Sequence, residues 1–198
     1  MSRRSLTVTA ALLAALVLAG CTSNDSLAQQ YREGNERGYI SGEFRVVEIA
    51  PQDRGEPVVF GGVTETGEAV SSDDYRGGVL VVNFWFAACA PCIVEAPLLE
   101  QVWQDYQEQG VAFLGINIYD QPATALSFAR DNNVTYPSVI DVDDGRVKLA
   151  FAQVTPIQAT PTTLFLDRDG RVAARIIGQL ASASILSTLV ADTLAESS

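Results

Sequence analysis

Hydrophobic and polar positions along residues 44–198 predict strands and helices in turn. Two uninterrupted apolar runs, residues 79–86 and 111–118, predict buried central strands, because a strand covered on both faces has no polar side. Helical spacing follows each run, and the turn sequence Asp-Arg-Asp-Gly at 167–170 separates two short strands. The pattern predicts helices over about 90–109, 122–132, 146–153 and 182–194, and further strands over about 138–140, 162–166 and 172–177.

The region before residue 79 carries weaker signals. Residues 58–60 and 68–70 predict a short hairpin with glycines at its turns, and residues 72–75 predict one helical turn. The order β-α-β-α-β-β-α that follows the hairpin predicts an α/β fold in which helices flank a central mixed sheet. We expect residues 21–43, which have little periodic apolar content, to form a flexible tether and residues 44–198 to form one domain.

Two cysteines, Cys89 and Cys92, follow the first central strand at the point where the chain is expected to turn into a helix. A helix N-terminus has unpaired N–H groups and the positive end of the dipole, and both stabilise a thiolate. The second cysteine lies one turn further on and can close a disulfide with the first. A disulfide across so short a loop adds little stability, which favours a redox-active pair of thioredoxin type. We expect Cys89 to have the lower pKa and to be alkylated faster.

Other roles for this pair have less support. A structural zinc site needs four ligands, whereas the chain has only three cysteines and no histidine. Attachment of c-type haem requires C-x-x-C-H, whereas Ile93 follows Cys92. Two inert buried thiols remain an alternative. We predict no metal site, and no cofactor other than the redox-active disulfide Cys89–Cys92.

The third cysteine, Cys21, directly follows a predicted N-terminal export signal, residues 1–20. Arg3 and Arg4 precede an apolar stretch, residues 6–19, which is short for a membrane span and suits a signal peptide. The sequence Leu-Ala-Gly-Cys at 18–21 resembles the lipobox of bacterial lipoprotein precursors. This resemblance implies removal of residues 1–20, a lipid on Cys21 and a lipid-anchored protein on the extracytoplasmic side of the cell membrane. Ordinary secretion and an uncleaved anchor are the alternatives.

Composition narrows the classes of partner. Hydrophobic residues make up 47% of the chain, which is enough for a sizeable core. The net charge of −11, with only 13 lysines and arginines, disfavours nucleic acid and leaves no polybasic patch for anionic lipid. Export places the domain where disulfides persist unless another protein reduces them.

Residues 83–97 resemble the active-site segment of the TlpA/ResA-like family; their sequence is Asn-Phe-Trp-Phe-Ala-Ala-Cys-Ala-Pro-Cys-Ile-Val-Glu-Ala-Pro. Members of that family are membrane-tethered thioredoxin-fold thiol–disulfide oxidoreductases of bacteria. Residues 71–78, 128–141 and 159–167 resemble further segments of that family, the last being the strand that begins at a cis-proline. The resemblance covers about residues 44–195 and is more specific than C-x-x-C alone. It implies a thioredoxin fold with an N-terminal β-hairpin extension.

The resemblance also implies a role for each matching residue. Cys89 matches the exposed nucleophilic cysteine, Cys92 the buried resolving cysteine, and Asn83 a position where thioredoxin has a buried acid. Glu95 matches a glutamate that we expect to be partly buried near Cys92 and to move its proton, whereas a solvated helix carboxylate is the alternative. The expected substrate groove contains Trp85 as core or groove wall, Ala90, Pro91, and Thr160 joined to Pro161 by a cis bond.

Several positions depart from the family pattern or carry other candidate chemistry. Ala88 replaces a tryptophan, which is expected to widen the groove and expose Cys89 more. Ala90-Pro91 replaces the common Pro-Pro, and residues 154–159 form a longer approach to the cis-proline than usual. The carboxylates that could suggest cation binding lack the spacing of a calcium loop, and we interpret them as loop carboxylates: Asp120, Asp141, Asp143 and Asp144.

The sequence thus predicts a monomeric, extracytoplasmic thiol–disulfide oxidoreductase. The resemblance implies a reductase of disulfides in exported proteins, including apocytochrome c during cytochrome c maturation, and a membrane dithiol donor that re-reduces the pair. An oxidase of the same fold that forms disulfides and a non-catalytic lipoprotein binding module are the alternatives. A peroxidase is disfavoured, because Phe86 stands where such enzymes have Thr or Ser three residues before the cysteine.

Overall fold

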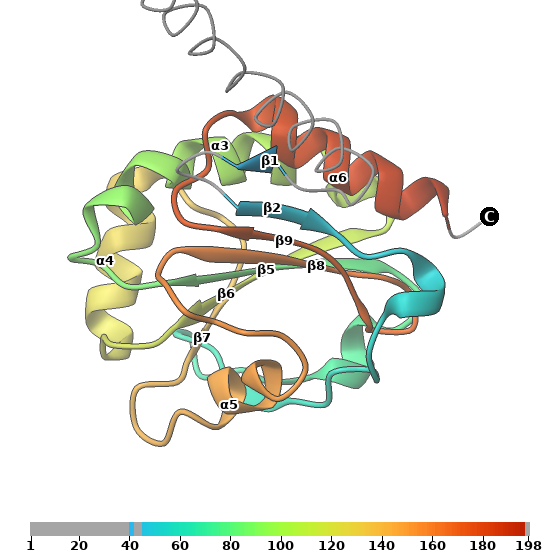
Figure 1. Ribbon diagram of the computed structural model, residues 1–198. Helices are drawn as coiled ribbons and strands as arrows, with labels where there is room; N and C mark the ends of the chain where they lie inside the picture. Colours follow the sequence, from blue (N-terminus) through green and yellow to red (C-terminus); the bar gives the residue numbers. More distant parts are fainter. Residues whose placement is uncertain (1–39, 42–44, 197–198) are drawn as a thin grey trace, which may run out of the picture. The chain divides into compact units, whose positions relative to one another are not determined.

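The computed structural model describes residues 40–41 and 45–196, which build a seven-stranded mixed sheet with helices on both faces (Figure 1). The strand order is β1-β2-β9-β8-β5-β6-β7. Its members are β1 (Ile40–Ser41), β2 (Arg45–Glu48), β5 (Val79–Trp85), β6 (Val111–Asn117), β7 (Ser138–Ile140), β8 (Thr162–Leu166) and β9 (Val172–Ile177). Since β5 pairs in parallel with β6 and antiparallel with β8, the strand before the cysteines lies at the centre.

Side chains of β5 alternate between two hydrophobic cores. Val79 and Val81 pack with residues of α3 (Ala90–Tyr106) and α6 (Ala183–Ala195) on one face of the sheet. Leu80, Val82 and Phe84 pack with residues of α5 (Arg146–Ala152) on the other face (Figure 1). Burial on both faces explains why this strand has a continuous apolar sequence.

Local signals account for the helix boundaries. Helix α4 (Pro122–Asn132) begins with a proline, which has no N–H, at a position where an N–H would have no partner within the helix. The helix ends before Asn133, which has a φ of 55°. Helix α3 continues into a short 3-10 helix η4 (Gln107–Gln109), and Gly110 closes it with a φ of 80°. The predicted helices and the strands after residue 79 are therefore confirmed, with shifts of a few residues at their ends.

The N-terminal part of the domain differs from the prediction. The hairpin consists of β3 (Gly61–Val63) and β4 (Ala69–Ser71), whereas Val58 and Phe60 are buried against α5 outside any strand. The 3-10 helix η3 (Ser72–Tyr75) matches the predicted helical turn, and another, η2 (Pro51–Asp53), was not predicted. Strand β2 also gave no usable signal, because its sequence Arg-Val-Val-Glu is short, and it pairs with β9.

The described residues include only a short part of the predicted tether. Ile40–Ser41, inside the segment predicted as a tether, pair with β2. The predicted signal peptide, Cys21 and the rest of the predicted tether, residues 22–39 and 42–43, lie outside the described residues. No helix in residues 40–41 and 45–196 is long and apolar enough to cross a membrane.

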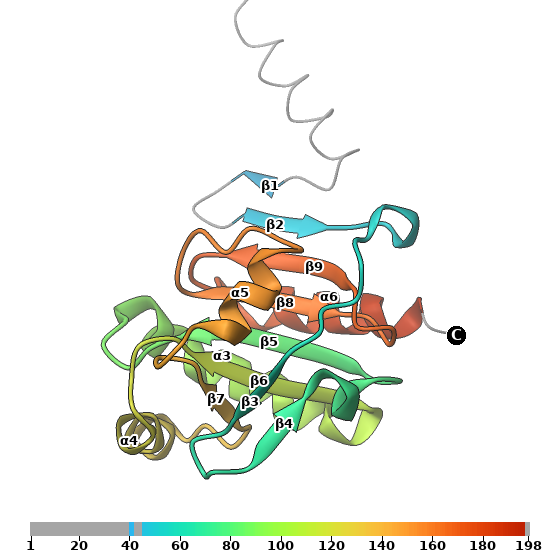
Figure 2. The same ribbon diagram turned by 90° about the horizontal axis from the view of Figure 1, so that it is seen from below.

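The hairpin attaches to the edge of the sheet through Glu65. The Glu65 backbone N–H donates to the Ser138 carbonyl at 2.9 Å, and the Ser138 N–H donates to the Glu65 carboxylate at 2.8 Å. An antiparallel bridge between Thr64 and Val139 continues this contact. Figure 2 shows the hairpin beside β7, so the extension covers an edge that would otherwise expose unpaired backbone groups.

Candidate active site around Cys89 and Cys92

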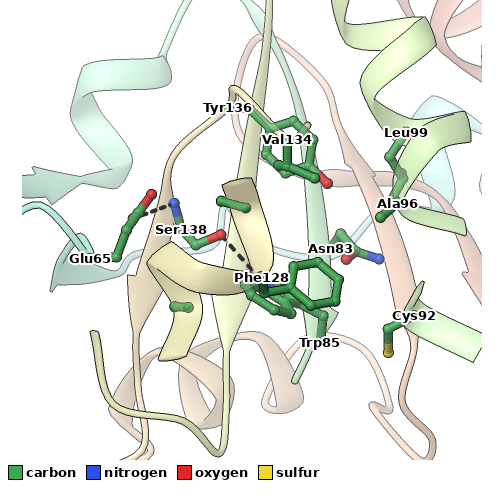
Figure 3. Close-up of a pocket in the computed structure, with 12 residues that line it drawn as sticks. Glu65, Asn83, Trp85, Cys92, Ala96, Leu99, Phe128, Val134, Tyr136 and Ser138 are labelled. Atoms are coloured by element: carbon green, nitrogen blue, oxygen red, sulfur yellow. Dashed lines mark hydrogen bonds between the residues drawn. The ribbon is translucent and has the colours of Figure 1, made fainter. Parts of the chain in front are cut away.

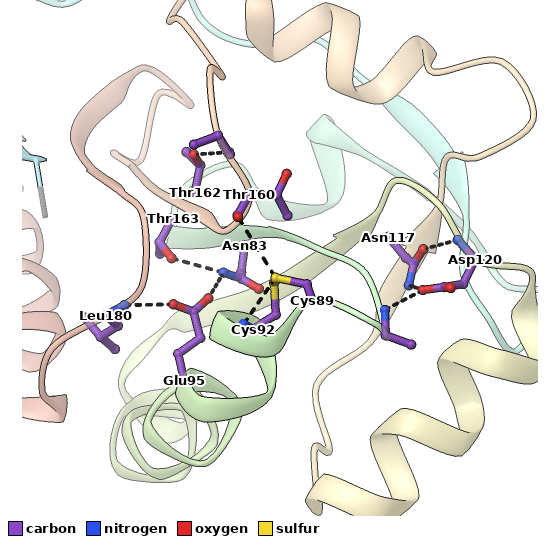
Figure 4. Close-up of a disulfide and its surroundings, with 12 residues drawn as sticks. Asn83, Cys89, Cys92, Glu95, Asn117, Asp120, Thr160, Thr162, Thr163 and Leu180 are labelled. Carbon is purple, nitrogen blue, oxygen red and sulfur yellow. Dashed lines mark hydrogen bonds between the residues drawn. A yellow bond between two sulfur atoms is a disulfide. The ribbon is translucent and has the colours of Figure 1, made fainter. Parts of the chain in front are cut away.

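Cys89 and Cys92 form a disulfide at the N-terminus of α3, with their Cα atoms 5.2 Å apart. Cys89 is the residue that caps the helix, and its Sγ atom accepts a hydrogen bond from the Cys92 N–H at 3.2 Å (Figure 4). This N–H is one of the groups that a helix leaves unpaired at its start. After reduction the same donor and the helix dipole would stabilise a thiolate on Cys89.

Both cysteines are buried in the disulfide form. Cys89 is 4% exposed and Cys92 2% exposed, so the expectation of an exposed Cys89 is wrong for this state. The reason is that the pair packs in a cluster with Trp85, Ala96, Ala125 and Phe128. Ala88 and Ala90 on either side of Cys89 are exposed and Pro91 is half-buried, so the accessible part of the predicted groove is the backbone and small side chains around the sulfur.

Glu95 lies one turn after Cys92, and its side chain is fully buried. Its carboxylate accepts hydrogen bonds from the Asn83 side-chain amide at 2.8 Å and from the Leu180 backbone N–H at 2.9 Å (Figure 4). Burial raises the pKa of Glu95 to about 7, although both hydrogen bonds act in the opposite direction. The alternative of a solvated surface carboxylate is therefore wrong.

Asn83 connects this carboxylate to the neighbouring strand. Its amide nitrogen also donates to the Thr163 hydroxyl on β8 at 3.1 Å. The interpretation of Asn83 as the counterpart of a buried acid is consistent with its position in β5, where it is 4% exposed. The buried carboxylate one turn after Cys92 thus comes from α3, and the strand supplies an amide that holds it.

The loop before β8 closes the site from the opposite side. The Thr160–Pro161 bond is cis, which confirms the sequence prediction. The Thr160 carbonyl oxygen lies 4.0 Å from Cys89 Sγ, and Pro161 is buried beside it in the chain. Residues separated by about 70 positions in the sequence therefore meet at the disulfide.

Trp85 forms a wall behind the disulfide. Its indole N–H donates to the Ser138 hydroxyl at 3.2 Å, and its ring contacts Phe128 with centroids 4.4 Å apart. Gly115 on β6 permits this position, because a Cβ there would lie 2.7 Å from the indole nitrogen. Trp85 is thus a buried wall residue with 6% exposure, which agrees with the prediction of core or groove wall.

Sequence reasoning missed a network that holds the loop before Cys89. The Asp120 carboxylate accepts hydrogen bonds from the Ala87 backbone N–H at 2.6 Å and from the Asn117 side chain at 2.9 Å. The Asn117 side-chain oxygen in turn accepts from the backbone N–H groups of Tyr119 and Asp120. The spacing Asn-x-x-Asp after a strand indicates a local turn, but it carries no sign of the contact with Ala87.

Asp141 also does more than a free loop carboxylate. Its two oxygens accept the backbone N–H groups of Val147 and Lys148 at 2.9 and 2.8 Å, which satisfies donors in the first turn of α5. Asp141 is only 5% exposed. Its role in this structure is to begin a helix that covers one face of the sheet.

Replacing Asp120 with alanine is expected to lower the free energy of unfolding by about 2 kcal/mol, because it leaves the Ala87 N–H and the Asn117 amide without an acceptor. Urea unfolding of the oxidised protein measures the change. Asp143→Ala removes an exposed carboxylate from a nearby loop and serves as the control. Equal stabilities of the two variants would show that Asp120 does not hold the loop.

Comparison with known proteins places this site in a family. The AhpC/TSA family matches residues 55–175 of the chain. The thiol-disulfide oxidoreductase ResA of Geobacillus thermodenitrificans is 36% identical over 112 residues, which make up 57% of this chain and 62% of that relative. ResA of Bacillus subtilis is 27% identical over 119 residues, or 60% of this chain and 64% of that relative. The matched segment spans less than two thirds of either relative.

A solved structure with a similar fold is a DsbF homologue from Corynebacterium diphtheriae, with 26% identity and a TM-score of 0.64 over 74% of this chain and 92% of that one. A thiol:disulfide interchange protein of the thioredoxin family from Chlorobium tepidum has 26% identity and a TM-score of 0.66 over 73% of this chain and 99% of its own. These similarities confirm the predicted thioredoxin fold and the resemblance to ResA. The family match covers more than half of the 198 residues and includes the cysteine pair, the cis-proline, and the strands β5 and β8 next to them. The chain therefore belongs to the AhpC/TSA family.

Proposed function

We propose that this protein is an extracytoplasmic thiol–disulfide oxidoreductase that reduces disulfides in exported proteins. The observation that carries the proposal is a disulfide at the start of α3 with a buried carboxylate, Glu95, held one turn behind it. The similarity to thiol-disulfide oxidoreductases of the ResA type supports this chemistry. Apocytochrome c during cytochrome c maturation is the substrate class that the resemblance suggests.

The residues suggest a two-step mechanism. The Cys89 thiolate attacks a substrate disulfide, a mixed disulfide forms, and one substrate thiolate leaves. Cys92 then gives its proton to Glu95 and attacks the Cys89 sulfur, which releases the second substrate thiolate and closes the Cys89–Cys92 disulfide. A membrane dithiol donor would restore the reduced pair, and the chemistry needs no bound cofactor.

Electrostatics favours the reducing direction over the alternative of a disulfide-forming oxidase. Strong oxidants of this class owe their potential to a stabilised reduced form. The side chains that pack against this pair are apolar and carry no positive charge, while Glu95 adds a negative charge when it ionises. Both features act against the stabilisation that the helix start gives to a Cys89 thiolate. We propose that they outweigh it and stabilise the disulfide, which makes the reduced pair a better reductant.

The direction and the catalytic role can be tested on the full chain. We expect the protein to accelerate reduction of insulin disulfides by dithiothreitol, and its reduction potential to lie nearer the about −270 mV of thioredoxin than the about −120 mV of strong periplasmic oxidants. A potential near the second value would support the oxidase instead. No acceleration of insulin reduction, with the pair intact, would leave the non-catalytic binding module as the better interpretation.

We further propose that a lipid on Cys21 holds the protein on the outer side of the cell membrane. The support is the lipobox-like Leu-Ala-Gly-Cys sequence at 18–21. In a bacterial host fed with radiolabelled palmitate, the wild type should be labelled and recovered with membranes, and Cys21→Ala should be unlabelled. Cys89→Ala, which keeps Cys21, is the control. Unlabelled wild-type protein in the medium would disprove the anchor.

A further inference from the structure

A narrow cavity lies between α3, α4 and the sheet, next to the cysteine pair (Figure 3). Its volume is about 10 Å³, which is close to the space that a single water molecule needs. Most of its wall is apolar, and the polar and ionisable side chains that line it are few: Glu65, Asn83, Cys92, Tyr136 and Ser138.

Two buried residues at this cavity, Tyr136 and Asn83, each have a side-chain oxygen for which no hydrogen bond to a described residue is found. The Tyr136 side chain is 6% exposed and contacts the Phe113 ring, but its hydroxyl makes no hydrogen bond to residues 40–41 or 45–196. Asn83 uses its amide nitrogen for Glu95 and Thr163, and no described residue donates to its amide oxygen. Figure 3 shows the Tyr136 hydroxyl directed toward the α3 side of the cavity, where Asn83 also lies. Buried polar atoms of this kind usually bond to protein or to ordered water.

We propose that this cavity binds one water molecule that joins Tyr136 to Asn83, and that Tyr136 is thereby a positioning residue for proton transfer between Cys92 and Glu95. The second half of this statement rests on the proposed function. The Tyr136 hydroxyl donates to the water oxygen, and the water donates to the Asn83 amide oxygen. The Asn83 amide nitrogen is then oriented to donate to the Glu95 carboxylate.

The charges around the cavity favour this direction of donation. The ionisable groups that face Tyr136 are Glu65 from the hairpin and Cys92, Glu95 and Glu100 from α3, whereas α4 contributes only Ala125, Phe128 and Ala129. None of these groups is basic. Burial, with added repulsion from Glu95 and Glu100, raises the pKa of Tyr136, so its hydroxyl stays protonated and can donate at every working pH.

Substituting Tyr136 with phenylalanine removes one oxygen atom and keeps the ring, so it tests the proposal without emptying the core. The full chain carrying Cys21→Ala, in which Cys89 and Cys92 are the remaining cysteines, is reduced and mixed with the aromatic disulfide DTNB. Attack by Cys89 breaks the reagent's S–S bond and releases the first coloured thiolate. Cys92 then loses its proton to Glu95, attacks the Cys89 sulfur and releases the second thiolate, so the pair is oxidised and the reagent is reduced. Only the second phase depends on Glu95.

In Tyr136→Phe the first phase should be unchanged, and the second should be about fivefold slower at pH 7 with its pH midpoint moved upward. Tyr106 lies at the far end of α3, and its hydroxyl bonds to Ser187 of α6. The control Tyr106→Phe removes that hydroxyl and should match the wild type in both phases. An unchanged second phase, or equal slowing of both phases, would overturn the role of Tyr136.

A second measurement tests the water itself. A high-resolution crystal structure of the wild type should show an ordered water within hydrogen-bond distance of Tyr136 Oη and Asn83 Oδ1. Its absence would overturn the proposal whether or not the protein catalyses thiol exchange. Failure of the wild type to release either thiolate, with the water present, would instead contradict the proposed function and with it the role of Tyr136 in proton transfer.

Discussion

Replacing Cys89 with serine is expected to abolish disulfide reduction, and replacing Cys92 with serine is expected to trap the protein on its substrate. A serine hydroxyl is not ionised near neutral pH and cannot replace the thiolate, so turnover of insulin should fall by roughly 10³-fold or more in Cys89→Ser. In Cys92→Ser the first attack still occurs, but no thiol resolves the mixed disulfide. Non-reducing electrophoresis and mass spectrometry measure the adducts.

The two variants control for each other, because both remove one sulfur atom from the same buried cluster. Cys89 also accepts the Cys92 N–H at the helix start, so we expect it to be alkylated faster than Cys92 in the reduced wild type. Adducts that accumulate on Cys89→Ser but not on Cys92→Ser would reverse the proposed roles. Equal alkylation rates would argue against selective stabilisation of a thiolate at Cys89.

Glu95→Gln is expected to slow the resolving step by about tenfold to a hundredfold above pH 7, because it removes the proton acceptor and keeps the side-chain shape. In the wild type this step should accelerate as pH rises through about 7, where Glu95 loses its proton. The variant should lack that inflection. Stopped-flow release of the second DTNB thiolate between pH 5 and 9, with Cys21→Ala in both proteins, provides the measurement. Superimposable profiles would remove Glu95 from the mechanism.

The same substitution should change how stability depends on pH. The pKa of Glu95 rises from 4.5 to about 7 on folding, so the folded state favours the protonated form. Its stabilising contribution is fully present below pH 4.5 and is lost as pH rises through about 7, a loss of about 3 kcal/mol. The stability of Glu95→Gln relative to wild type should therefore rise by about that amount between pH 4.5 and 8.

Urea unfolding of the oxidised proteins at several pH values measures this difference. Glu108→Gln, at an exposed position beyond the end of the same helix, controls for the loss of one negative charge. A relative stability of Glu95→Gln that does not change with pH would show that burial of the carboxylate costs less than the structure indicates.

The sequence by itself determined the elements whose signals are local. The apolar run at 79–86 predicted the central strand, and the position of Cys89 and Cys92 after it predicted a redox pair at a helix start. Pro122 predicted the first residue of α4, and the Asp-Arg-Asp-Gly turn predicted the β8–β9 hairpin. Such signals are legible because periodicity and turn chemistry depend only on near neighbours in the chain.

Only the tertiary structure decided what surrounds the cysteines. Cys89 is buried because Ala125 and Phe128 of α4 join its cluster, and Glu95 is held by the N–H of Leu180, which lies 85 residues away. The contact of Asp120 with Ala87 likewise joins two loops that the sequence presents as unrelated. Periodicity shows which side of a segment is apolar but not which distant segment covers it. The burial and hydrogen bonds that set the chemistry of this site therefore depend on how the helices and loops pack around the sheet.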